Sequence, residues 1–176
     1  EDPRRQRQMC IRDSHNYLIT HRGGKHSSIP SFLINYHRID EEQDVKDYIS
    51  RLRNIEPLMD DLILQLELRQ EVKKIAPAFV FPQAIKTSEN IISGYPFEET
   101  KKQNVIYEDF MKKLNALEMS DALKLRYQSE VEAVLVTIVN YSYRKLITFL
   151  EEQQKLADNN HGVCLLYTSP SPRDTG

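Results

Sequence analysis

The stretch "SDALKLRYQSEVEAVLVTIVNYSYRKLITFLEEQQKLAD", residues 120–158, decides the fold class of this chain. Its apolar residues recur every three or four positions, which is the period of an amphipathic helix and not of a strand. Ser120 precedes the first turn, where a hydroxyl can accept hydrogen bonds from free backbone N–H groups. We therefore expect a long helical segment, with a bend near Asn140. Its predicted buried stripe is Tyr127, Val131, Val134, Leu135, Ile138, Val139, Leu146, Ile147 and Leu150.

Two further helices are predicted upstream, at residues 41–54 and 57–73. Asp40 followed by Gln43 is typical of a helix start. Pro57 either ends or kinks the first helix, or opens the second in its first turn, where the missing N–H costs nothing. The apolar stripe of the second helix ends at Lys73 and Lys74, cations that are favourable at a helix C-terminus. The predicted buried residues are Val45, Tyr48, Ile49, Leu52, Leu58, Met59, Leu62, Ile63 and Leu66.

The middle of the chain predicts two shorter helices. "PAFVFP", residues 77–82, is expected to be an extended bridge, because the residue before a proline is disfavoured in a helix. The helix after it ends at Gly94. Thr100 and Gln103 match a capping box and predict the start of the next helix. The predicted apolar faces are Ala84, Ile85, Ser88, Ile91 and Ile92, then Val105, Ile106, Phe110, Leu114 and Leu117.

Residues 15–39 have a different composition from the helical regions. The segment contains Gly23-Gly24, Ser27-Ser28 and Pro30, with aromatic and β-branched residues around them. This pattern predicts a loop with short strands on either side. The whole chain is therefore expected to be all-α, with amphipathic helices packed as a partial helical domain and an irregular or short-strand N-terminal segment.

The two ends of the chain are predicted to be adapter-derived and not native. Residues 8–14 can be encoded by a DNA sequence that begins CAGATGTGTATAAGAGACAG. The reverse complement of AGATGTGTATAAGAGACA, a stretch inside it, encodes "CLLYTS", residues 164–169. This element resembles the transposase adapter used to build sequencing libraries. We therefore assign residues 1–14 and 164–176 to adapter and residues 15–163 to the native N-terminal helical region of a larger protein. Both cysteines, Cys10 and Cys164, lie in the ends.

The charge of residues 15–163 is ordinary. With the ends set aside, 19 Lys and Arg face 22 Asp and Glu, a net charge of −3. This balance argues against a nucleic-acid partner. No apolar run approaches the roughly 18 residues that span a bilayer.

No catalytic or metal-binding residue is predicted from spacing. His21 and His26 flank Arg22-Gly-Gly-Lys25, but the loop holds two cations and no carboxylate, which favours a solvated loop over a metal site. His37 and Asp40 could form a ligand pair or an acid–base pair, although a helix-entry turn explains them better. No helix contains H-E-x-x-H. Three tyrosines at helical positions are expected in the core or an interface: Tyr107, Tyr141 and Tyr143.

A family resemblance goes further than these patterns. Residues 20–63, together with "PAFVFP" and "LITFLEEQQKLADNNHGV", closely resemble the bacterial family known as domain of unknown function eight-eight-five. The resemblance is specific in "HRGGKHSSIPSFLINYHRID", residues 21–40. Members are longer, mostly helical proteins that look like relatives of the carboxypeptidase Taq type of zinc peptidase. Their C-terminal half carries an H-E-x-x-P-G-H-H motif, in which histidines hold zinc and the glutamate is the general base.

The resemblance implies a function for the parent and a lesser role for this chain. The motif is absent, so the resemblance assigns no catalytic residue, metal ligand or cofactor here; zinc and a peptide substrate are implied for the parent. We expect an inactive N-terminal part that forms one wall of the substrate cleft. Its substrate-binding candidates are Arg22, Lys25, Ser27 and Ser28. It would pack against its missing C-terminal domain and expose an apolar face alone. The alternative is a helical binding or scaffold domain without chemistry. The compartment, exported or cytoplasmic, stays open.

Overall fold

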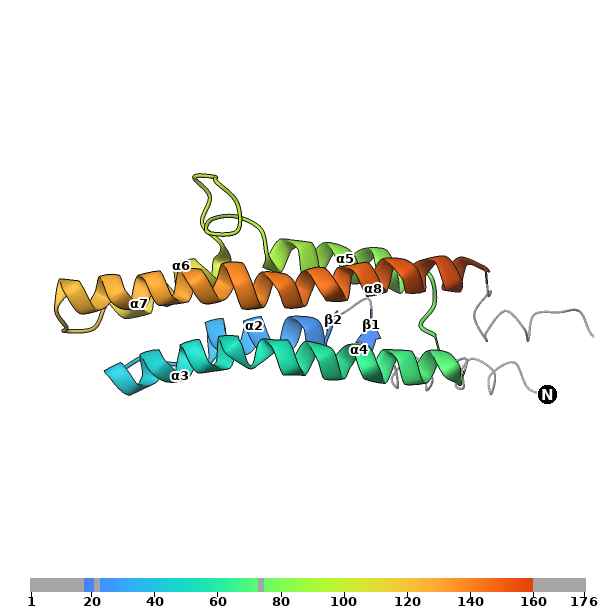
Figure 1. Ribbon diagram of the computed structural model, residues 1–176, viewed down its shortest axis with the longest axis horizontal. Helices are drawn as coiled ribbons and strands as arrows, with labels where there is room; N and C mark the ends of the chain where they lie inside the picture. Colours follow the sequence, from blue (N-terminus) through green and yellow to red (C-terminus); the bar gives the residue numbers. More distant parts are fainter. Residues whose placement is uncertain (1–17, 21–22, 73–74, 160–176) are drawn as a thin grey trace, which may run out of the picture.

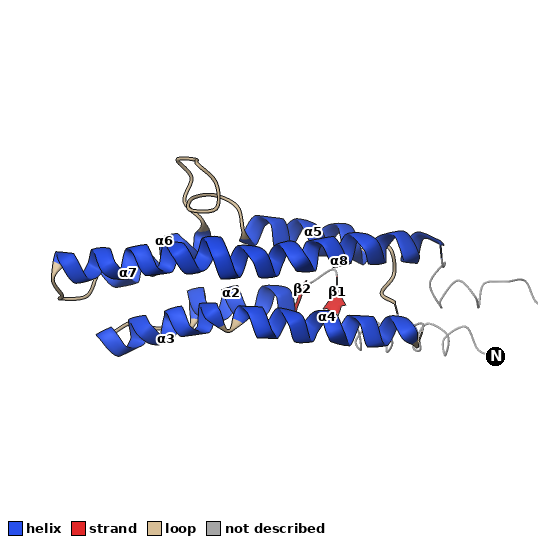
Figure 2. Ribbon diagram, viewed as in Figure 1, coloured by secondary structure: helices blue, strands red, loops and turns tan. Residues whose placement is uncertain are grey.

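The structure, a computed structural model, describes residues 18–20, 23–72 and 75–159. Helices dominate these ranges, and a two-residue strand pair stands at their start (Figure 2). The prediction of an all-α chain with a short-strand N-terminal segment is confirmed. The elements are β1 (Ile19–Thr20), β2 (Gly23–Gly24), α2 (Lys25–Asn35), α3 (Glu42–Arg53), α4 (Ile55–Glu71), α5 (Val80–Ile91), α6 (Val105–Asn115), α7 (Asp121–Val134), the π-helical segment η1 (Leu135–Val139) and α8 (Asn140–Asn159).

Two long helical rods face each other along the molecule (Figure 1). One rod is α3 followed by α4, and the other is α7, η1 and α8 in continuous succession. Helix α3 packs against α7 and η1, while α4 packs against η1 and α8. Helices α5 and α6 pack on α8 and α7, and α2 contacts α4, α5 and α6. The stripe of residues 120–158 is therefore buried from more than one side.

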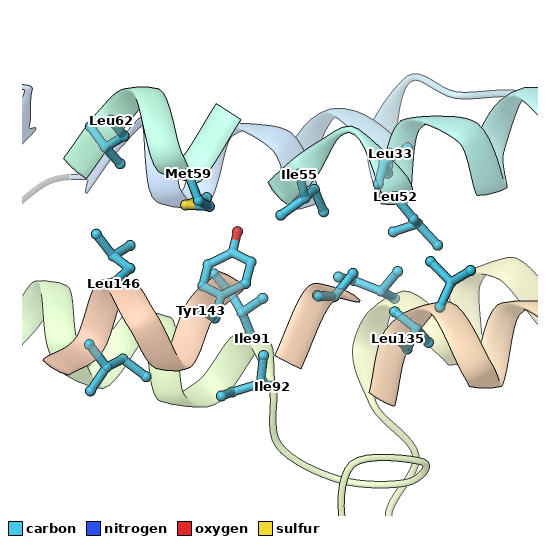
Figure 3. Close-up of a cluster of buried hydrophobic side chains, with 14 of the residues drawn as sticks. Leu33, Leu52, Ile55, Met59, Leu62, Ile91, Ile92, Leu135, Tyr143 and Leu146 are labelled. Atoms are coloured by element: carbon cyan, nitrogen blue, oxygen red, sulfur yellow. The ribbon is translucent and has the colours of Figure 1, made fainter. Parts of the chain in front are cut away.

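The core lies between the two rods (Figure 3). Tyr143 and Leu146 point toward Met59 and Leu62 of α4, and all four side chains are at most 1% exposed. The expected packing of the long stripe against residues 41–54 and 57–73 is confirmed, with Ile138 only partly buried. The backbone irregularity next to Asn140 is the π-helical segment η1.

Two predicted core positions are wrong. Leu58 and Val105 are about half exposed, because each points away from the side of its helix that the buried residues occupy. Tyr141, expected in the core or an interface, is not in the core, since it is exposed and Lys145 Nζ lies 5.9 Å from its ring centroid. Helical spacing fixes which residues share a face, but the boundary of the buried face depends on the neighbouring helices.

The prediction of a loop at residues 25–35 is wrong, because these residues form α2. Pro30 lies inside this helix and has no N–H to donate to the carbonyl oxygen of His26, four residues earlier. Tyr143 of α8 supplies the missing donor, since its hydroxyl donates to His26 O at 2.5 Å. A contact between residues 117 positions apart thus satisfies the group that the proline leaves free.

The predicted starts of several helices also need correction. "PAFVFP" is not an extended bridge throughout, because α5 begins at Val80 and Pro82 lies in its first turn, where no N–H is needed. Pro57 likewise lies in the first turn of α4. Helix α3 begins at Glu42, and the Asp44 carboxylate, not Asp40, accepts the free backbone N–H groups there.

The predicted start of the helix after Gly94, now α6, is also wrong. The predicted box of Thr100 and Gln103 lies before the helix, and Asn104 is the capping residue. The capping of α7 by Ser120 is confirmed.

Candidate functional site

The N-terminal candidate lies where the strand pair meets α2. Ile19 pairs with Gly24 and Thr20 with Gly23, and the Thr20 hydroxyl donates to Gly23 O at 2.9 Å. A Cβ atom on Gly24 would lie 2.6 Å from Leu18 O, so only glycine fits there. Gly23 has a φ of 137°, a conformation that strongly favours glycine. Both glycines are therefore needed for the turn itself.

The predicted substrate-binding residues are placed unequally. The Ser27 hydroxyl is engaged at the helix start, since it accepts the Gly24 N–H at 3.3 Å and donates to Gly24 O at 3.1 Å. The Ser28 hydroxyl is exposed and donates to Lys25 O at 3.1 Å. Lys25 is exposed as well, while Arg22 lies outside the described residues. The first turn of α2 thus presents one cation, Lys25, and the Ser28 hydroxyl to solvent, and an ammonium group of this kind forms strong hydrogen bonds to carboxylates.

His26 occupies the interior side of the same turn. Its side chain is 1% exposed, and Nδ1 has no hydrogen-bond partner among the described residues. Burial lowers the pKa of His26 to about 4, so the ring is neutral near pH 7. The solvated-loop interpretation of His26 is therefore wrong. His21 lies outside the described residues, and within the described ranges no three His, Cys, Asp or Glu side chains gather as a metal site would require.

A second polar cluster, not predicted from the sequence, surrounds Glu132. Oε1 of Glu132 accepts from the Tyr107 hydroxyl at 2.8 Å, and from the Tyr95 hydroxyl and Gln128 Nε2 at 3.2 Å each. Burial and the carboxylate raise the pKa of Tyr107, and the carboxylate raises that of Tyr95. Both phenols therefore remain donors. The cluster fastens the loop between α5 and α6 onto α7. Tyr95 and Tyr107 are 37 and 25 positions from Glu132, too far to give a local signal in the sequence.

A third cluster joins α2, α3 and α6. Asp109 Oδ2 accepts from the Tyr48 hydroxyl at 3.0 Å and lies 2.8 Å from Lys113 Nζ. Lys113 also donates to Leu33 O at 2.9 Å and Ile34 O at 3.2 Å. These are carbonyls of the last turn of α2, where a cation is favourable. All of these contacts hold helices together.

His37 and Asp40 are not brought together as a chemical pair. His37 is buried, and its Nε2 donates to Asp44 O at 3.1 Å. The Asp40 carboxylate instead lies 3.5 Å from Arg38 Nε. The two residues therefore belong to the turn that leads into α3.

Comparison with known proteins places the chain in a family. The model of the family described as "Bacterial protein of unknown function (DUF885)" matches residues 3–174. The chain belongs to this family. The match includes most of the residues that we predict to be adapter-derived, and that assignment stays a prediction. None of the curated proteins matches the chain.

A solved crystal structure shares the fold. It is a protein of Colwellia psychrerythraea named as a candidate lipoprotein, 20% identical to this chain, with a TM-score of 0.74. The similarity covers 80% of this chain but 23% of that protein, so the chain spans about a quarter of its length. Within the described ranges, no helix has the length and apolar character needed to cross a bilayer.

Proposed function

We propose that this chain is the non-catalytic N-terminal helical region of a longer bacterial zinc-dependent peptidase. The main support is that its fold corresponds to 23% of a much larger protein, as expected for one part of a multi-part enzyme. The polar clusters around Glu132 and Asp109 also support it, because their hydrogen bonds fasten helices to each other.

Zinc-dependent peptide hydrolysis needs a set of metal ligands and a base, which other parts of the parent would supply. A catalytic zinc takes about three protein ligands, an open position for water and a base beside it. In the proposal, these groups come from the H-E-x-x-P-G-H-H motif of the family, in a region that this chain does not contain. The helices described above would form one wall of the cleft that holds the peptide.

The first turn of α2 is the part of that wall proposed to contact substrate. Lys25 carries a positive charge next to a helix N-terminus, where free backbone N–H groups also favour an anion. The exposed Ser28 hydroxyl adjoins it, and Arg22 completes the proposed set. A carboxylate or carbonyl of the peptide would accept from these donors.

The test compares this chain with the longer parent protein. Each is dialysed against zinc, then bound metal and hydrolysis of a peptide panel are measured. We expect the parent to hold zinc and turn over peptides, and this chain to do neither. In the parent, Lys25→Ala should raise the KM several-fold with kcat unchanged, while Lys101→Ala, on the distant loop before α6, should leave both unchanged. Stoichiometric zinc with turnover in this chain alone would refute the proposal; an inert parent would support the helical scaffold alternative.

A further inference from the structure

Helix α4 has apolar side chains on two opposite faces. Its inner face packs on η1 and α8, with Met59 and Leu62 pointing toward Tyr143 and Leu146 of α8 (Figure 3); Leu66 is also buried. Leu64, Leu68 and Val72, the residue that caps the C-terminus of α4, follow each other at intervals of four residues, on the face turned away from this core. They are 52%, 52% and 64% exposed, respectively. We call these three residues the outer stripe; it extends over about 12 Å at 1.5 Å per residue.

This pattern differs from that of a surface helix. A surface helix has one apolar stripe and charged residues opposite, whereas a helix that is apolar on all sides is normally covered on all sides. Helix α3, in the same rod, has the surface pattern, since its buried residues Val45, Tyr48, Ile49 and Leu52 share one face. Helix α3 therefore lacks an exposed apolar stripe of the kind that α4 carries.

Among the residues that the structure describes, the rim of the outer stripe is acidic. Asp61, Glu67 and Glu71 of α4 are all exposed beside it. A second copy of this chain would bring the same carboxylates against each other, and like charges at a shared contact are unfavourable. An anionic membrane surface would be repelled for the same reason. A binding partner with Lys or Arg beside its own apolar residues would instead be attracted by these carboxylates.

We propose that the outer stripe binds an amphipathic helix whose apolar residues are flanked by Lys or Arg, contributed by another part of the same longer polypeptide. This partner rests on the proposal that the chain is one part of a longer protein. The similar solved protein extends over about four times the matched length, which supplies ample chain for such a helix. Apolar residues of the partner would pack between Leu64, Leu68 and Val72, and its cations would pair with the acidic rim.

The probe is a synthetic peptide helix with leucines at every third or fourth position, flanked by lysines. Two matched peptides serve as controls: one with glutamates for the lysines, and one of scrambled order with the same composition. Binding to the full chain is measured by fluorescence anisotropy, with the unfolding midpoint of each variant recorded. We expect Leu64→Ser/Leu68→Ser to weaken binding at least tenfold without a change in fold, because both side chains are exposed. Leu125→Ser, an exposed leucine of α7, should bind as the wild type does.

The rim is tested separately. Glu67→Gln/Glu71→Gln should weaken binding of the lysine peptide several-fold and remove most of its salt dependence. Equal binding of the scrambled or glutamate peptide, or binding unaffected by loss of the two leucines, would overturn the proposal. So would self-association of the chain through the outer stripe, detected by sedimentation, or adsorption to phosphatidylglycerol vesicles that is lost in the leucine variant. None of these measurements depends on zinc or peptide hydrolysis, so a failure here is distinguishable from a failure of the peptidase proposal.

Discussion

At the scale of single residues, the pairing of Tyr143 with His26 O explains how α2 tolerates Pro30. Tyr143 is fully buried, and its hydroxyl is the donor that replaces the proline's absent N–H. Tyr143→Phe would keep the packing and leave that carbonyl without a donor. We expect the free energy of unfolding to fall by about 1–3 kcal/mol, measured by urea denaturation.

A double-mutant cycle separates this hydrogen bond from general packing. Pro30→Ala restores a backbone N–H that can donate to His26 O. Tyr143→Phe should therefore cost less stability in the Pro30→Ala background than in the wild type. An equal cost in both backgrounds would show that the hydroxyl has another role.

His26 makes stability depend on pH. Burial lowers its pKa in the folded protein to about 4, whereas an unfolded histidine titrates near 6.5. The unfolded state therefore binds the extra proton first, so the stabilisation is complete above about pH 6.5 and is lost as the pH falls toward 4. The difference corresponds to about 3 kcal/mol.

The measurement is the free energy of unfolding from pH 8 to 4. The His26→Gln variant, which cannot take up this proton, should lose less stability over that range than the wild type. Parallel curves for the two proteins would contradict a neutral buried imidazole.

At the scale of elements, Asn104 joins α5 to α6. It is buried; Nδ2 donates to Ile91 O and Ser93 O at 2.8 Å each, and Oδ1 accepts from the N–H of Ile106 at 3.0 Å. Asn104→Ala would leave buried carbonyls and the start of α6 unsatisfied. We expect a loss of about 2–4 kcal/mol, measured by urea denaturation. Thr100→Ala, which removes the cap expected from the sequence, should change stability by less than about 0.5 kcal/mol; a larger loss at Thr100 would reverse the assignment.

The helices were predictable where the spacing of their apolar residues, or the residue at their start, is enough to identify them. The spacing of Val45, Tyr48 and Leu52, and that of Val131, Leu135 and Leu146, is enough to place them on buried faces. The start of α7 at Ser120 was predictable for the same reason. Helix α2 was not, because its glycines, serines and proline have loop propensity, and the contact that stabilises it comes from Tyr143, 117 positions away.

The candidate site was predictable only in part. Lys25, Ser27 and Ser28 could be grouped from the sequence because they are neighbours in it. The sequence could not show that the Ser27 hydroxyl forms hydrogen bonds with the Gly24 backbone. It also could not show that His26 is buried. The Glu132 cluster draws its four residues from a loop, α6 and α7, so its assembly is a property of the tertiary structure alone.

At the scale of the whole molecule, the two predicted adapter-derived ends supply a last test. If residues 1–14 and 164–176 are translated adapter, no selection has matched them to the core. A shortened protein of residues 15–163 should then have the same helical content and an unfolding midpoint within about 1 °C of the full chain, measured by circular dichroism. The physical reason is that stability comes from buried apolar surface, and the core residues that the structure describes, from Leu18 to Ala157, all lie inside residues 15–163.

A matched deletion shows that the measurement can detect a real loss. Shortening the chain further, to residue 149, removes Leu150, Gln153 and Ala157, which are buried in α8, together with the hydrogen bond from Gln153 Nε2 to Gln70 Oε1. Removing Leu150 alone should cost about 2–5 kcal/mol, so the midpoint should fall by many degrees. A comparable fall on removing only residues 1–14 and 164–176 would mean that these ends pack on the native core, and it would overturn their assignment to adapter.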